Sequence, residues 1–146
     1  MRAIKFRGAN REEGWVYGNL ILGRKEYRGE NLDKPVYAYI ARFKDNGEVF
    51  PIEPVRVAPS TVGQFTGLYD KNGKEIYEGD IICRDGSNRH YVVQMDEEFF
   101  SIYALFYRTE WNSRLQFADF LKRYFTDAYE IIGNIFDNPE LLAQNG

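Results

Sequence analysis

The chain has few of the residues on which enzyme active sites usually depend. Its 146 residues include one cysteine, Cys83, and one histidine, His90. A single cysteine excludes an internal disulfide. Even if Cys83 and His90 approach across a hairpin, two ligands are fewer than the three or four that a zinc site needs, and they make no catalytic triad. Cys83 ends the apolar run Ile81–Cys83, where a buried and unreactive thiol is the usual interpretation.

Long hydrophobic runs and nucleotide-binding motifs are also missing. No run of about 18 apolar residues occurs, so we expect no membrane span. The first 14 residues lack the apolar core of a signal peptide, which favours a cytoplasmic protein. Neither G-x-x-x-x-G-K-[ST] nor G-x-G-x-x-G is present. We identify no catalytic residue, no cofactor site and no metal site in the sequence.

Aromatic residues and glycines are abundant by contrast. The chain contains 11 Tyr, 11 Phe and 13 Gly, and 44% of its residues are hydrophobic. Aromatic and β-branched residues favour strands, and glycine favours turns, so we predict a mainly β protein. The segment Ala58–Thr61 is the best candidate boundary. It divides the chain into an N-terminal β subdomain, residues 1–60, and a C-terminal subdomain, residues 61–146.

Alternating patterns predict the strands of the N-terminal subdomain. The strand at 2–7 and the strand at 15–22 should form a hairpin. In a third strand, 36–43, Tyr37, Tyr39 and Ala41 share one face. The segment 49–57 is extended, and Pro51 and Pro54 place it at a sheet edge because proline cannot donate to a ladder.

The C-terminal subdomain begins with a tight hairpin. Asp70–Lys74 forms the turn between strands at 65–69 and 75–77, and Gly73 supplies the positive φ. Further strands are predicted at 81–83, 90–95, 99–105 and 128–136. Leu115, Ala118, Leu121 and Phe125 have helical spacing, which predicts one inserted helix at about 113–125. Asn138 and Pro139 open a short terminal helix.

Four segments in this order make the chain resemble the YopX family: Ile4–Arg7 with Trp15–Gly18, Val62–Leu68, Asp70–Asp80, and Gly133–Phe136 with Asn138–Leu142. The resemblance implies a small, partly open SH3-like barrel in the C-terminal half and a phage or prophage origin in a bacterial host. It implies no established biochemical activity. The motif residues to which we assign a structural role are Phe65, Thr66, Gly67, Asp70, Gly73, Ile76, Tyr77, Gly79 and Asp80.

A group of carboxylates in the third segment allows two interpretations. Asp70, Glu75, Glu78 and Asp80 lie close together in sequence, and two of them are enough for acid–base catalysis by a hydrolase. Aspartates in turns, however, commonly accept hydrogen bonds from nearby backbone N–H groups. We favour this second, structural interpretation.

Charge is distributed unevenly along the chain. Residues 1–62 hold 11 Lys and Arg against 8 Asp and Glu, whereas residues 63–146 hold 8 against 14. This asymmetry can steer one copy of the chain onto another or direct a basic face toward phosphates. Lys5, Arg7, Trp15 and Tyr17 combine cations with aromatic rings, as single-stranded nucleic-acid binders do.

The function we expect is non-enzymatic. Aromatic residues, which are enriched in protein interfaces, crowd residues 103–125 and include Trp111, Phe117, Phe120 and Tyr124. With Lys5, Arg7 and Trp15 they form our candidate interaction surface. We expect a protein-interaction or assembly module, with a protein partner or a homo-oligomer. Sequence-tolerant binding of single-stranded nucleic acid is the alternative, and a hydrolase is third.

Overall fold

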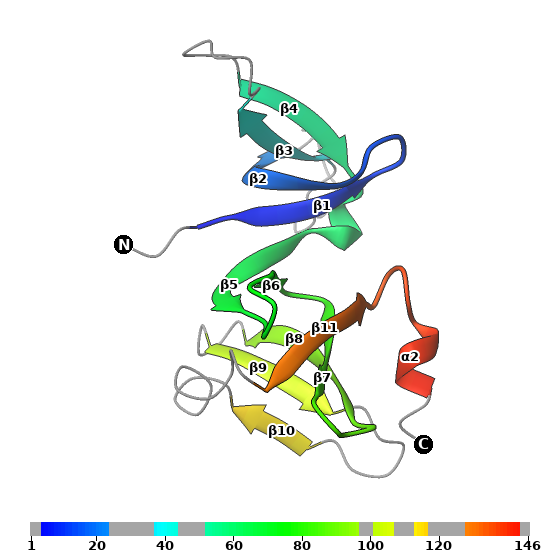
Figure 1. Cartoon of the computed structure of the whole chain (residues 1–146). Coiled ribbons are helices and arrows are strands. Elements are labelled where there is room, and N and C mark those ends of the chain that lie inside the picture. Colours follow the sequence, from blue (N-terminus) through cyan, green and yellow to red (C-terminus); the bar gives the residue numbers. More distant parts are fainter. Residues whose placement is uncertain are drawn as a thin grey trace, which may run out of the picture. The chain divides into compact units, whose positions relative to one another are not determined.

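The computed structural model describes residues 4–23, 37–43, 52–96, 101–106, 113–116 and 128–143. The chain divides into two compact units, Met1–Gln64 and Phe65–Gly146. The described residues form antiparallel sheets with little helix, which confirms the predicted mainly β fold (Figure 1).

The N-terminal unit is built on four antiparallel strands in the order β4-β3-β2-β1. They are β1 (Phe6–Asn10), β2 (Gly14–Gly23), β3 (Tyr37–Phe43) and β4 (Ile52–Val57). A short 3-10 turn, η1 (Pro59–Thr61), follows, and the start of β5 (Gly63–Tyr69) pairs with β1. As predicted, β4 is an edge strand of this sheet.

The first hairpin starts later than the alternating pattern predicted. Ile4 and Lys5 precede β1, and Gly8–Asn10, expected to be part of a turn, continue the strand. The turn itself is short because the Asn10 side chain closes it, with Oδ1 accepting hydrogen bonds from the N–H groups of Glu12 (2.8 Å) and Glu13 (2.9 Å). An asparagine that caps its own turn in this way replaces a longer loop.

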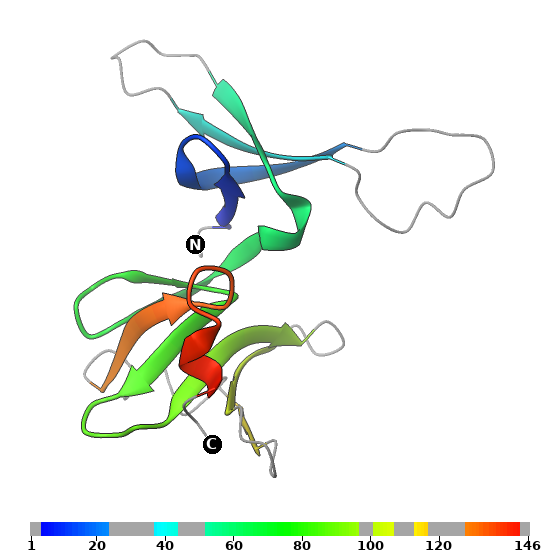
Figure 2. The ribbon, with the colours of Figure 1, turned by 90° about the vertical axis from the view of Figure 1, so that its right-hand side faces the viewer.

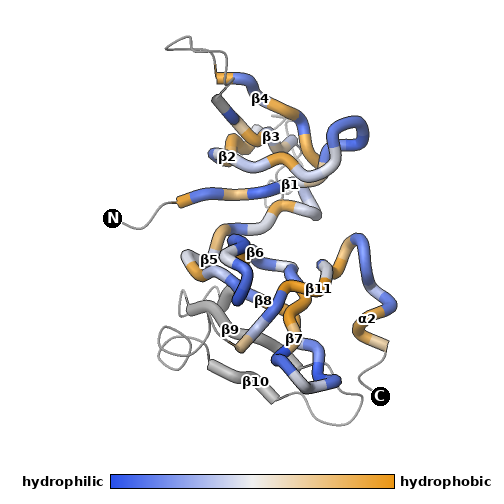
Figure 3. Tube along the Cα trace, in the orientation of Figure 1, coloured by the Kyte–Doolittle hydropathy of each residue, from blue (hydrophilic) through white to orange (hydrophobic). Residues whose placement is uncertain are grey.

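One face of this sheet forms the core of the N-terminal unit. Leu20, Ile40 and Val55 are register partners on β2, β3 and β4, and they share this face with Val16 and Val57. At the end of β4, buried Val55 and Val57 flank exposed Arg56, as expected of a strand with one buried face, and Figure 3 shows hydrophobic and hydrophilic stretches along this strand. The residues between the core positions therefore point to the opposite side.

The C-terminal unit contains a five-stranded antiparallel sheet in the order β10-β9-β8-β7-β11. The rest of β5 pairs with β6 in the hairpin predicted around Gly73. The elements that follow β5 are β6 (Glu75–Tyr77), β7 (Asp80–Arg84), β8 (His90–Asp96), β9 (Ser101–Phe106), β10 (Ser113–Gln116), β11 (Tyr129–Asn134) and the helix α2 (Glu140–Ala143). Figure 2 shows the loop that leads from β11 into α2.

The predicted helix at 113–125 is wrong at its start. Ser113–Gln116 is strand β10, which pairs with β9 through Arg114 opposite Leu105 and Leu115 opposite Ala104. A ladder partner satisfies the backbone groups that a helix would bond internally, and a short apolar pattern cannot distinguish the two structures. Residues 117–125 lie outside the described part of the chain.

The SH3-like barrel stays a prediction. Within the described residues neither sheet closes on itself, since β10 and β11 are the outer strands of the five-stranded sheet. The hydrophobic core of the C-terminal unit contains Ile76, Ile82, Tyr91 and Val93. No helix in the described ranges is long and apolar enough to cross a membrane.

Candidate interaction surface

The Asp70 turn shows how the structure uses the motif carboxylates. Asp70 is buried, and its Oδ1 accepts hydrogen bonds from the N–H groups of Asn72 and Lys74, both at 2.9 Å. Its Oδ2 accepts from the Ile131 N–H at 3.1 Å, which ties the turn to β11. Gly73 completes the turn with φ 79°. Three backbone donors therefore converge on this one carboxylate.

Other motif side chains make similar contacts. Asp80 is buried and its Oδ2 accepts from the Tyr77 N–H at 2.7 Å. The Thr66 hydroxyl donates to the Ile76 carbonyl at 2.8 Å and accepts from the Leu68 N–H at 3.1 Å. The remaining motif residues are either buried or have positive φ: Phe65, Ile76 and Tyr77 are buried, while Gly67 and Gly79 have φ 80° and 86°.

The two glutamates of the carboxylate group are less buried than the aspartates. Glu75 Oε2 accepts a hydrogen bond from the Tyr77 hydroxyl at 2.7 Å, and Glu78 is half-buried. A general acid or base must reach a substrate proton. Asp70 and Asp80 are instead held in the interior by backbone N–H donors, as expected of aspartates with a structural role in turns.

Cys83 and His90 are register partners on β7 and β8, but their polar atoms bond elsewhere. The Cys83 thiol donates to the Ser87 carbonyl at 2.9 Å. His90 Nδ1 lies 2.7 Å from the Leu141 carbonyl, which can only accept, so Nδ1 carries the proton and holds α2. Across the residues with described positions, no three metal-ligating side chains come together.

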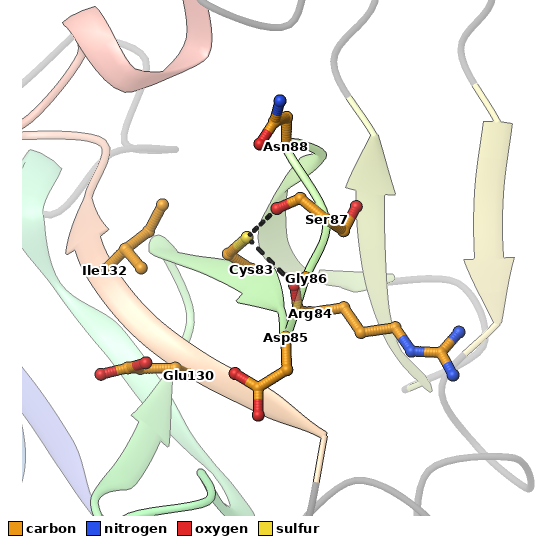
Figure 4. Close-up of a pocket in the computed structure, with 8 residues that line it drawn as sticks. All are labelled: Cys83, Arg84, Asp85, Gly86, Ser87, Asn88, Glu130 and Ile132. Atoms are coloured by element: carbon orange, nitrogen blue, oxygen red, sulfur yellow. Dashed lines mark hydrogen bonds between the residues drawn. The ribbon is translucent and has the colours of Figure 1, made fainter.

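A pocket of about 380 Å³ lies beside Cys83 (Figure 4). Its carboxylates, Asp85 and Glu130, both bind the Lys71 ammonium, at 2.6 and 2.8 Å. Burial raises the pKa of the Cys83 thiol above its usual value, and the charges of Asp85 and Glu130 raise it further. Because a thiol is nucleophilic only as thiolate, the pocket does not activate Cys83.

The N-terminal sheet presents a different kind of surface on the side opposite its core. Paired residues in antiparallel strands share a face, so Arg7 lies with Tyr17, and Ile21 lies with Tyr39 and Arg56. We call this side the open face. Its members on β1–β4 include Arg7, Trp15, Tyr17, Asn19, Ile21, Tyr37, Tyr39, Ala41, Pro54 and Arg56.

Large apolar side chains of the open face reach solvent. Tyr17 is 41% exposed and Ile21 46% exposed, although both lie in the middle of a strand. The Arg56 guanidinium stacks over the Tyr37 ring, 4.9 Å from its centroid. Lysine, aspartate and glutamate are absent from the members named above. By contrast Arg42, which points to the other side, bonds Glu13 at 2.7 Å and Glu53 at 3.1 Å.

The structure corrects the sequence-based view of Arg7. The sequence predicted Arg7 and Lys5 as members of an interaction surface, but Arg7 is only 5% exposed. Its guanidinium lies 4.6 Å from the centroid of the ring of Trp15, which is half-buried. Lys5 is half-buried just before β1.

The other predicted interaction residues, Trp111, Phe117, Phe120 and Tyr124, lie outside the described residues. Sequence reasoning missed Tyr39, Ile21 and Arg56 as members of one surface. The grouping of Tyr37, Tyr39 and Ala41 on one face of their strand was predicted correctly. The missing information was the strand pairing, which brings β3 beside β2 and β4 beside β3.

Comparison with known families covers nearly the whole chain. The model of the family described as YopX protein matches residues 5–143. The chain belongs to the YopX family. Among solved structures, this YopX-family protein is similar to a crystal structure of protein EF1440 from Enterococcus faecalis, with 24% sequence identity and a TM-score of 0.45. That match covers 97% of this chain and 99% of the other. No curated protein matches the chain.

Proposed function

We propose that this YopX-family protein is a non-enzymatic protein-interaction module and that the open face is its contact surface. The observation that carries the proposal is the composition of that face. Arg7 and Ala41 are buried, and the members that reach the surface are mainly tyrosine, tryptophan, isoleucine and Arg56, while Lys, Asp, Glu and Ser are missing from its named members. This is the composition that distinguishes the centre of a protein interface from ordinary surface.

Energetic considerations support the same proposal. Exposed Tyr17 and Ile21 gain favourable free energy when a partner removes them from water. Tyrosine, tryptophan and arginine are also the residues whose truncation most often costs more than about 2 kcal/mol of binding free energy. A sheet is a rigid scaffold, so little conformational entropy is lost when its face is covered.

Binding of single-stranded nucleic acid is the second candidate. The Arg56–Tyr37 stack and the lack of carboxylates on the open face suit a phosphate backbone with stacked bases. Buried Arg7 and the formal net charge of −3 weigh against it. A hydrolase, our third hypothesis, has less support because Asp70 and Asp80 accept backbone hydrogen bonds. We expect the protein to act in the cytoplasm of a bacterial host.

The proposal can be tested by affinity capture from a lysate of the cells in which the protein occurs. The tagged wild type is compared with Tyr17→Ser/Ile21→Ser, with and without nuclease. Tyr69→Ser is the matched control because Tyr69 is similarly exposed, at 44%, but belongs to the C-terminal unit. Circular dichroism verifies that each variant is folded.

We expect a protein partner that survives nuclease, is retained by Tyr69→Ser and is lost from Tyr17→Ser/Ile21→Ser. Partners that disappear on nuclease treatment would move nucleic-acid binding to first place. A partner retained equally by all three proteins would exclude the open face as the contact surface.

A further inference from the structure

We infer that the occupant of the open face is a turn in the C-terminal unit of a second copy of this chain, so that copies associate head to tail. The turn is Ile135–Glu140, which runs from the end of β11 to the first residue of α2 and which we call the C-terminal turn (Figures 1 and 2). The inference rests on the proposed function, since it names the partner of the same face.

The C-terminal turn is held in one conformation by its own hydrogen bonds. Asn134 is buried, and its Oδ1 accepts from the N–H groups of Phe136 (3.0 Å) and Asp137 (2.9 Å). The Asn138 N–H donates to the Asn134 carbonyl at 2.9 Å. A turn that is ordered before binding loses little entropy when it docks.

The outer surface of this turn is apolar and acidic. Phe136 is 38% exposed, and Asp137, Pro139 and Glu140 are exposed as well. Asp137 accepts a hydrogen bond from Asn134 Nδ2 at 2.8 Å, which fixes one carboxylate at the surface. The segment contains two carboxylates and no lysine or arginine.

The open face has the complementary character. It offers the exposed apolar side chains of Tyr17 and Ile21 together with the Arg56 cation, and its named members lack carboxylates. Phe136 and Pro139 of the turn can be buried against the apolar side chains of the face. Asp137 and Glu140 are attracted to the Arg56 cation. The whole chain has the same asymmetry, because residues 1–62 carry excess positive charge and residues 63–146 excess negative charge.

Charge also disfavours the simplest alternative for a self-associating face. Two open faces packed on each other would bring together two surfaces that each carry the Arg56 cation, with no carboxylate among the named members of either face to offset the like charge. A face-to-turn contact avoids this repulsion. Such a contact joins two different surfaces, so each added copy leaves one free face and one free turn, and assembly continues to a ring or an open chain.

Sedimentation velocity over a concentration series tests the inference with two variants. The face variant is Tyr17→Ser/Arg56→Glu, and the turn variant is Phe136→Ser/Glu140→Lys. We expect the wild type to associate reversibly and each variant to associate at least about tenfold more weakly. Raising NaCl from about 0.05 to 0.5 M should weaken association of the wild type.

The decisive measurement is an equimolar mixture of the two variants. The face variant keeps an intact turn and the turn variant keeps an intact face, so together they should form a dimer and nothing larger. The matched control is Tyr69→Ser/Arg89→Glu, in two exposed residues outside both surfaces, which should associate as the wild type does. Circular dichroism and the thermal midpoint verify folding of every variant.

A mixture that contains only monomers while the wild type assembles would overturn the inference, as would a turn variant that assembles normally. A wild type that stays monomeric at high concentration would overturn it too. In that last case the proposed function survives if the capture experiment finds another protein partner that Tyr17→Ser/Ile21→Ser loses. The two proposals therefore fail by different results.

Discussion

At the scale of single residues, buried polar side chains organise the C-terminal unit. Asp70, Asp80, Thr66 and Asn134 are buried, and each of them accepts hydrogen bonds from backbone N–H groups at a turn or strand end. A short side chain that satisfies several backbone donors replaces the secondary structure that is missing there. Three of the motif residues, Asp70, Asp80 and Thr66, therefore bond the backbone of the segments beside them.

Replacing Asp70 should measure this role directly. Asp70→Ala leaves three backbone N–H groups without their acceptor, so we expect the free energy of unfolding to fall by about 3 kcal/mol. Urea denaturation followed by circular dichroism gives the value. Asp85→Ala is the control, because it removes an exposed partner of Lys71 and should cost less than about 1 kcal/mol. Equal losses in the two variants would contradict the structural role of Asp70.

Cys83 supplies a prediction about pH. Burial, Asp85 and Glu130 raise its pKa above the usual 9.0, so the folded state holds the thiol proton more tightly than the unfolded state. The contribution of this thiol to the free energy of unfolding is therefore fully present below the pKa that Cys83 has in the unfolded chain. It is lost as pH rises through the pKa that Cys83 has in the folded protein. At pH 8 we expect iodoacetamide to alkylate the folded protein at least about threefold more slowly than the urea-unfolded chain.

A variant next to the thiol checks the sign of this effect. Asp85→Asn removes one negative charge that raises the Cys83 pKa, so alkylation of the folded variant should be faster than that of the wild type at the same pH. Slower alkylation of Asp85→Asn would show that the local charges do not act as described. Mass spectrometry of the modified peptide gives both rates.

At the scale of elements, the connection from β11 to α2 depends on a close approach between Gly133 and Asn138. A Cβ at position 133 would lie 2.5 Å from Asn138 Oδ1 and 2.8 Å from its Cγ. Asn138 Oδ1 also accepts the Asn134 N–H at 3.3 Å. The sequence correctly marked Asn138 and Pro139 as the start of a terminal helix, but the Asn138 side chain bonds back toward β11, a contact that no local pattern contains.

Gly133→Ala should therefore displace Asn138 and destabilise the protein by roughly 1–3 kcal/mol. In Gly133→Ala/Asn138→Ala the clash is reduced, so the two losses should not add, and a coupling of about 1 kcal/mol is expected in a double-mutant cycle. Thermal or urea unfolding of the four proteins gives the cycle. Additive losses would indicate that the two side chains do not compete for the same space.

The error at the start of the predicted helix also belongs to this scale. Leu115 and Ala118 fit a helical spacing, yet Leu115 lies in a strand that pairs with β9. The competing structures differ only in whether a neighbouring strand is present, which is information from outside the segment.

At the scale of the whole molecule, the described residues form two separate hydrophobic cores, one in each unit. Ile40 lies in the core of the N-terminal unit and Ile82 in that of the C-terminal unit, and both are completely buried. Neither described cluster shares a residue with the other. Each core therefore stabilises mainly its own sheet.

Matched core substitutions should separate the two units. Ile40→Ala and Ile82→Ala each create a cavity expected to cost about 2–5 kcal/mol within its own unit. By hydrogen exchange and mass spectrometry, Ile40→Ala should accelerate exchange mainly in β1–β4, and Ile82→Ala mainly in β7, β8 and β11. If either variant accelerates exchange equally throughout, the two units unfold as one.

The sequence by itself determined the features that depend on neighbouring residues: the mainly β class, the Asp70–Gly73 turn, the edge position indicated by Pro54, and the family motifs. Only the tertiary structure decided which residues meet. Pairing of β2, β3 and β4 brought Tyr17, Ile21 and Arg56 onto one face. Elsewhere, contacts between distant segments placed Arg7 beside the Trp15 ring and tied Asp70 to β11. The physical reason is that turn chemistry and alternation are local, whereas strand pairing is settled by which distant segments bury apolar surface together.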